Sequence, residues 1–138
     1  MKQSSVLRWK FAGRLFVFSW FFIGGICHFA IPEPFLRIMP PYIPYHLACV
    51  YISGAFELLG AVGIWINSVR SFSGYGLMLL TAIVTLANVE MYLHPNLFPS
   101  LPHWWLVIRF PLQGLLIWLI WWCTRPDLVV SDSRLIIE

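Results

Sequence analysis

Residues 47–66 have the sequence LACVYISGAFELLGAVGIWI, in which Glu57 is the single charged side chain. As an α-helix rising about 1.5 Å per residue, this run is about 30 Å long, which matches the hydrocarbon core of a bilayer. The apolar residues are continuous and do not alternate with polar ones, so the run does not fit a strand of a membrane barrel. We therefore predict a transmembrane helix over these residues.

Three further apolar runs of similar length predict three more transmembrane helices, over residues 11–31, 72–93 and 104–123. The composition agrees, because 59% of the 138 residues are hydrophobic and only 11% are charged. Such a chain cannot build a water-soluble surface, which excludes a soluble enzyme, a nucleic-acid-binding protein and a disordered tail. We predict an all-α fold, a polytopic membrane four-helix bundle. The four-transmembrane domain covers residues 12–124, between an N-terminal segment at 1–11 and a tail at 125–138.

The basic residues predict the orientation of the bundle, because Lys and Arg concentrate on the cytoplasmic side of membrane proteins. Only Arg37 falls on one side, whereas the other side carries Lys2, Arg8, Lys10, Arg14, Arg70, Arg125 and Arg134. Both termini are therefore expected in the cytoplasm, in a bacterial inner membrane. The first apolar run exceeds the hydrophobic region of a signal peptide, so we expect it to be retained. The loops at 32–46 and 94–103 are rich in proline, which favours turns over helix.

Several polar side chains lie inside the predicted spans, where an ionisable residue costs about 2.5–3.5 kcal/mol unless it has a partner or a cavity. Glu57 is near the middle of the second span. In the fourth span, helical spacing places Gln113 one turn deeper in the membrane than Arg109, on the same face. In the third span, the same spacing places Asn88 on one face with the other polar residues of that helix. Every helix contributes to one polar layer, and we predict a shared polar or ligand-binding site formed by His28, Ser53, Glu57, Asn88, Arg109 and Gln113.

The economical arrangement of this layer pairs an ionised Glu57 with Arg109. In the alternative, Arg109 extends toward the outer interface and Glu57 is protonated. Pro111 removes a helical hydrogen bond in the fourth span, and we expect a bend there. The network has two interpretations, a site that opens outward or a structural network that fixes helix register.

Other chemistry is not indicated. The loop histidines match no metal-ligand spacing, and the three cysteines form no CxxC pair, so we expect no metal site and free thiols. We find no haem-ligand histidine pair within the spans, no nucleophile–base pair and no phosphate loop. Independent catalysis is therefore not expected.

Five short segments in this order resemble the DoxX-like family of small four-span membrane proteins. They are GICHFAIP (25–32), MPPYIP (39–44), SGAFE (53–57), Asn88 near the end of the third span and RFPLQ (109–113). The resemblance covers residues 12–124, although Leu86 replaces the proline that the family usually has before Ala-Asn. It implies an accessory subunit beside a quinone-linked oxidase or thiosulfate:quinone oxidoreductase. Similar animal proteins resemble assembly chaperones for receptors.

Three functions follow as hypotheses. The first is an accessory or binding protein for a quinone- or lipid-like molecule, in which Arg109 and Gln113 contact the headgroup, His28 exchanges a proton and Glu57 sets the charge. The second is an assembly chaperone or scaffold whose polar network is purely structural. The third is proton-coupled transport through Glu57, which requires a homo-oligomer because four spans are too few for alternating access. The expected partners are membrane lipid, a redox enzyme or another membrane protein, and not nucleic acid.

Overall fold

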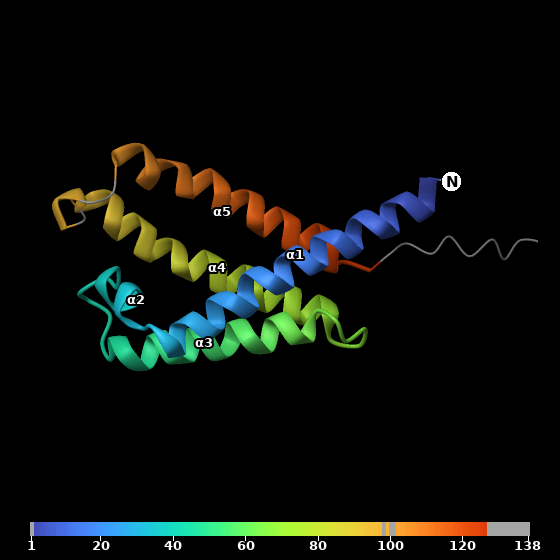
Figure 1. The fold of residues 1–138 in the computed structure, drawn as a ribbon, viewed down its shortest axis with the longest axis horizontal. Coiled ribbons are helices and arrows are strands. Elements are labelled where there is room, and N and C mark those ends of the chain that lie inside the picture. The colour runs from blue at the N-terminus through green and yellow to red at the C-terminus, as the bar shows by residue number, and fades with distance from the viewer. Residues whose placement is uncertain (1, 98, 100–101, 127–138) are drawn as a thin grey trace, which may run out of the picture.

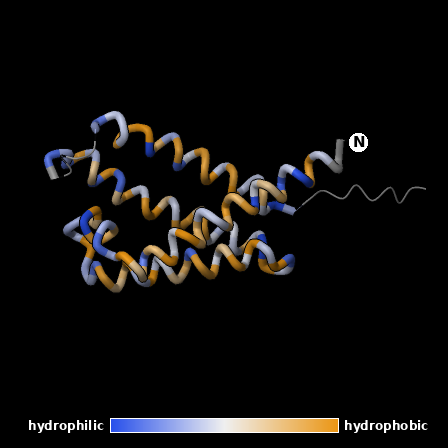
Figure 2. The backbone as a smooth tube through the Cα atoms, viewed as in Figure 1, coloured by the Kyte–Doolittle hydropathy of each residue, from blue (hydrophilic) through white to orange (hydrophobic). Residues whose placement is uncertain are grey.

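The computed structural model describes residues 2–97, 99 and 102–126. Its elements are α1 (Lys2–Ala30), α2 (Glu33–Arg37), α3 (His46–Gly63), α4 (Arg70–Leu93), the 3-10 helix η1 (Pro95–Leu97) and α5 (His103–Thr124). The described residues form no strand. Four helices are long and apolar enough to cross a membrane, and they are α1, α3, α4 and α5. The prediction of an all-α, multi-pass membrane four-helix bundle is therefore confirmed, and apolar residues recur along all four helices (Figure 2).

The start of α1 and the end of α5 lie at the same end of the bundle, which we call the terminal end (Figure 1). The opposite end carries α2 and η1, and we call it the loop end. Helix α1 crosses the bundle diagonally. Near its start, Gly13 packs against Cys123 of α5, and near its end Gly25 packs against Leu58 of α3. Because α1 leaves α5 to reach α3, the space between α1 and α5 widens toward the loop end.

The packed core lies in the terminal half of the bundle. Its buried residues come from all four long helices and are Val17, Phe21, Ala61, Ile64, Leu77, Ile120 and Cys123. Glycines allow the close approach of neighbouring helices in this half, with Gly60 of α3 facing Leu77 of α4, and Gly74 of α4 facing Thr124 of α5. Gly54, further along α3 toward the loop end, allows a similar close approach to His28 of α1.

The helices of the structure differ from the predicted apolar runs at several ends. Helix α1 begins at Lys2 rather than near residue 11, so the segment before the apolar run is also helical. The second transmembrane helix ends at Gly63 instead of residue 66, and turns follow it. The loops at the loop end contain the short helices α2 and η1, where only turns were expected. Proline does not oppose a helix in its first turn, and Pro34 occupies that position in α2. Helix α5 runs from His103 through Pro111 to Thr124, close to the predicted span of 104–123.

Candidate functional site

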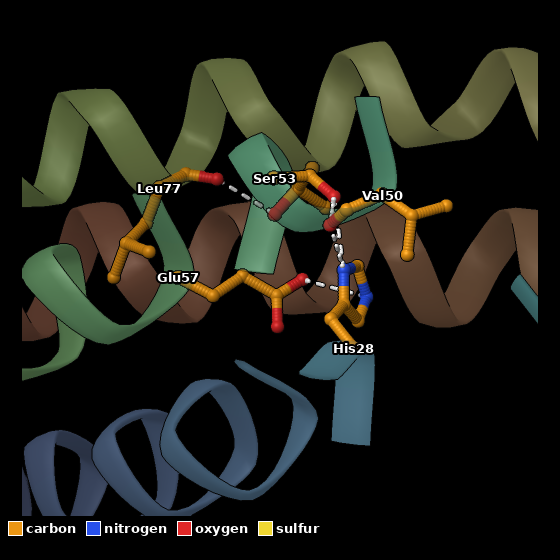
Figure 3. Close-up of polar contacts among 6 residues, drawn as sticks. His28, Val50, Ser53, Glu57 and Leu77 are labelled. Atoms are coloured by element: carbon orange, nitrogen blue, oxygen red, sulfur yellow. Dashed lines mark hydrogen bonds and ion pairs between the residues drawn. The ribbon is translucent and has the colours of Figure 1, made fainter. Parts of the chain in front are cut away.

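The first cluster of polar side chains lies between α1 and α3. The Nδ1 atom of His28 is 2.9 Å from the Val50 carbonyl oxygen and 2.9 Å from Ser53 Oγ. Its Nε2 atom is 3.8 Å from Oε1 of Glu57 (Figure 3). Both His28 and Glu57 are buried, at 6% and 9% exposed surface. The α1 backbone can come this close because Gly24 lies against the carboxyl group of Glu57, where any Cβ would collide with Oε2.

The loop end covers this first cluster. The ring of Phe35, in α2, lies 3.9 Å from the ring of His28, measured between centroids. Since α2 sits at the loop end of the bundle (Figure 1), the aromatic ring separates the histidine from that side of the membrane. Phe35 therefore covers the His28 ring on the loop-end side.

The second cluster lies between α4 and α5 and forms a hydrogen-bonded chain. Arg109 donates to Asn88 Oδ1 at 3.4 Å, and Asn88 donates through Nδ2 to Gln113 Oε1 at 2.8 Å. Gln113 donates through Nε2 to the carbonyl oxygen of Thr81 at 3.2 Å. The i, i+4 spacing of Arg109 and Gln113 and the spacing of Thr81 and Asn88 place these groups on facing sides of the two helices. The predicted proximity of Asn88, Arg109 and Gln113 is thus confirmed.

The predicted ion pair between Glu57 and Arg109 is not formed, since no ion pair within 4.0 Å joins these two residues. The guanidinium of Arg109 instead contacts Met91 Sδ at 3.0 Å and lies 5.8 Å from the centroid of the Trp105 ring. Both residues lie toward the loop end from Arg109, which agrees with the alternative arrangement in which this side chain extends toward the interface. The physical reason is the arrangement of the helices. Glu57 meets α1, whereas Arg109 faces α4.

A cavity of about 550 Å³ separates the two clusters. All four long helices line it, and its walls are almost entirely apolar. Its residues are Phe16, Trp20, Phe21, Glu57, Leu80, Thr81, Val84, Leu112, Gln113, Leu115, Leu116 and Leu119. A volume of this size suits a small amphipathic molecule, because ligand sites commonly enclose about 300–1,000 Å³ with a few polar groups in an apolar wall.

The cavity lies at the middle of the membrane. Its residues from α1 and α4 are near the centres of the spans Ser5–Ala30 and Arg70–Leu93. The rim residues of α1 and α5 are about half exposed: Phe16 51%, Trp20 58%, Leu112 49% and Leu115 57%. At this depth the surroundings are acyl chains. The cavity therefore opens sideways into the bilayer between α1 and α5.

Of the predicted site residues, Glu57 and Gln113 line the cavity, and His28, Ser53, Asn88 and Arg109 do not. His28 contacts Glu57, and Ser53 contacts His28. In the other cluster, Asn88 donates a hydrogen bond to Gln113, and Arg109 donates one to Asn88. The contact role expected for Arg109 is therefore wrong for this cavity. The predicted site omitted Thr81, although its place on the polar side of the third span signalled it. The apolar residues at the rim of the cavity could not be identified from the sequence, because they resemble any other lipid-facing side chains.

The remaining titratable residues lie elsewhere. His94 Nδ1 is 2.9 Å from Oε1 of Glu90 at the loop end, and His46 Nε2 is 3.1 Å from the Pro40 carbonyl oxygen. Within the described part of the chain, no three His, Cys, Asp or Glu side chains are grouped to hold a metal ion. Cys27, Cys49 and Cys123 are free thiols.

Comparison with known protein families assigns the chain to a family. No curated protein and no solved structure matches the chain. Residues 18–124 match the family described as a domain of unknown function, DUF8561, and this region contains both polar clusters and all of the cavity lining except Phe16. The chain therefore belongs to the DUF8561 family.

Proposed function

We propose that this protein is a membrane-embedded binding protein that takes a quinone- or lipid-like amphipathic molecule from the bilayer. The molecule enters between α1 and α5 and places its apolar part against the leucines of α4 and α5. Its headgroup reaches Glu57 and Gln113, the two predicted site residues in the cavity wall. The observation that carries the proposal is the cavity itself, which is apolar, lies at mid-membrane depth and has a few polar groups in its wall.

The same proposal includes a role beside a redox enzyme and a location in a bacterial inner membrane. The resemblance to DoxX-like proteins supports an accessory role beside a redox enzyme that uses the bound molecule. The excess of basic residues at the terminal end supports cytoplasmic termini, and the resemblance supports a bacterial inner membrane. The α4–α5 hydrogen-bonded chain favours a second, structural role for part of the network, because Asn88 donates a hydrogen bond to Gln113 across the two helices.

The proposal predicts that an amphipathic molecule co-purifies with the protein in polymer nanodiscs, which extract it together with its native lipid. Lipid extraction and mass spectrometry measure the amount relative to bulk lipid. Substituting Val84→Trp places an indole in the cavity and should reduce that amount about tenfold, since the volume needed by the ligand is filled.

The matched control is Ile83→Trp, on the neighbouring residue of α4. Ile83 is 53% exposed to lipid and does not line the cavity, so the co-purifying molecule should remain. Equal loss in both variants would contradict the proposal, as would a wild-type protein that carries no molecule enriched over bulk lipid.

A further inference from the structure

We propose that the headgroup bound in the cavity is a hydroxyl group, as in a long-chain alcohol or an alkylphenol, and that it donates its hydrogen bond to Glu57. This inference rests on the proposed function and adds the chemistry of the ligand. It follows from counting which donors and acceptors of the cavity wall are already used within the protein. Four lining residues carry side-chain hydrogen-bonding groups, namely Trp20, Glu57, Thr81 and Gln113, and the indole of Trp20 can only donate.

Thr81 and Gln113 have little capacity left to bind a ligand. The hydroxyl of Thr81 donates its one hydrogen to the Leu77 carbonyl oxygen at 2.7 Å. The Gln113 amide accepts from Asn88 and donates one N–H to the Thr81 carbonyl. The amide therefore keeps one N–H and one lone pair on Oε1, and the Thr81 hydroxyl keeps only acceptor capacity.

Glu57 is the main unused acceptor in this wall, because neither of its oxygens takes part in a hydrogen bond among the described residues. A carbonyl only accepts hydrogen bonds, so the contact of His28 Nδ1 with the Val50 oxygen places a hydrogen on Nδ1. The opposite atom, Nε2, faces Oε1 of Glu57. Two lone pairs do not face each other favourably, so a hydrogen lies between these atoms, on one or the other. In both cases that hydrogen points along the line to His28.

The carboxyl group of Glu57 consequently presents lone pairs to the cavity. Its side chain keeps 12% of its accessible surface, and no hydrogen bond to either oxygen forms among the described residues. A hydroxyl group fits this wall, because it supplies the hydrogen-bond donor that the carboxyl group of Glu57 lacks. An ether or a carbonyl can only accept, so it leaves Glu57 without a donor.

A matched pair of probes tests the inference. The first is 4-octylphenol, and the second is 4-octylanisole, its methyl ether, which has the same ring and chain but no donor. Binding is measured by titration of the protein in lipid nanodiscs, with empty nanodiscs subtracted. The phenol should bind about tenfold more tightly than the ether. In Glu57→Leu the phenol affinity should fall to that of the ether, and ether binding should persist, which shows that the cavity remains folded.

The control variant is Glu90→Leu, because Glu90 pairs with His94 at the loop end and does not line the cavity. This variant should keep the tenfold preference for the phenol. Equal binding of the two probes, blocked by Val84→Trp, would overturn the hydroxyl inference and leave the proposed binding function standing. Binding of neither probe would overturn the inference, while the co-purification experiment would decide the proposed function separately.

Discussion

Gly54→Ala should destabilise the bundle by about 1–3 kcal/mol, the range observed for overpacked interiors. A Cβ on Gly54 would lie 2.6 Å from Cβ of His28 and 3.2 Å from the carbonyl oxygen of Gly25. Neither atom belongs to the flexible end of a side chain, so α1 and α3 must move apart as whole helices. The separation also removes His28 from the Val50 carbonyl. The free energy of unfolding in mixed micelles of mild detergent and sodium dodecyl sulfate, followed by tryptophan fluorescence, measures this effect.

The same substitution at Gly76 is the control. Gly76 lies in α4, and a Cβ there meets no atom within 4 Å. Alanine has a higher helix propensity than glycine, so Gly76→Ala should leave stability unchanged or raise it by up to about 1 kcal/mol. If the two variants were equally stable, the close contact between α1 and α3 would be refuted.

The four membrane helices were predictable because each apolar run is long enough to cross the hydrocarbon core. The residues at which the helices begin and end were harder to predict. Hydropathy marks only the part of a helix that lies in lipid, whereas α1 continues to Lys2, beyond its apolar run. Helix α2 does not follow from the sequence pattern, because proline usually marks turns. Pro34, however, occupies the first helical turn, where no backbone donor is lost.

The candidate site was predictable in depth but not in pairing. The position along a helix gives the depth of Glu57 and of Arg109 in the membrane. The free-energy cost of placing a charged side chain in the hydrocarbon core indicates that each needs a polar partner. Height alone does not say which neighbouring helix a side chain meets. That choice depends on the diagonal path of α1, which Gly24, Gly25 and Gly54 allow by bringing α1 onto α3. The cavity results from the same diagonal path, and no pattern of single residues signals it.

Double-mutant cycles should separate the two polar clusters energetically. His28 and Glu57 contact each other, so the cycle formed by His28→Leu and Glu57→Leu should give a coupling energy of about 1 kcal/mol in the free energy of unfolding. The cycle formed by Arg109→Leu and Glu57→Leu should give less than about 0.5 kcal/mol, because these residues share no contact. The same mixed-micelle unfolding experiment measures all the variants.

A third cycle, formed by Asn88→Leu and Gln113→Leu, sets the scale, because these side chains share a direct hydrogen bond of 2.8 Å. If the cycle of Arg109 and Glu57 matched this third value, the two ions would interact and the separation of the clusters would be wrong. Additive effects for that pair, together with coupling inside each cluster, would mean that the cavity lies between two independently supported walls. Glu57 would then be available to a ligand without first breaking an ion pair with Arg109.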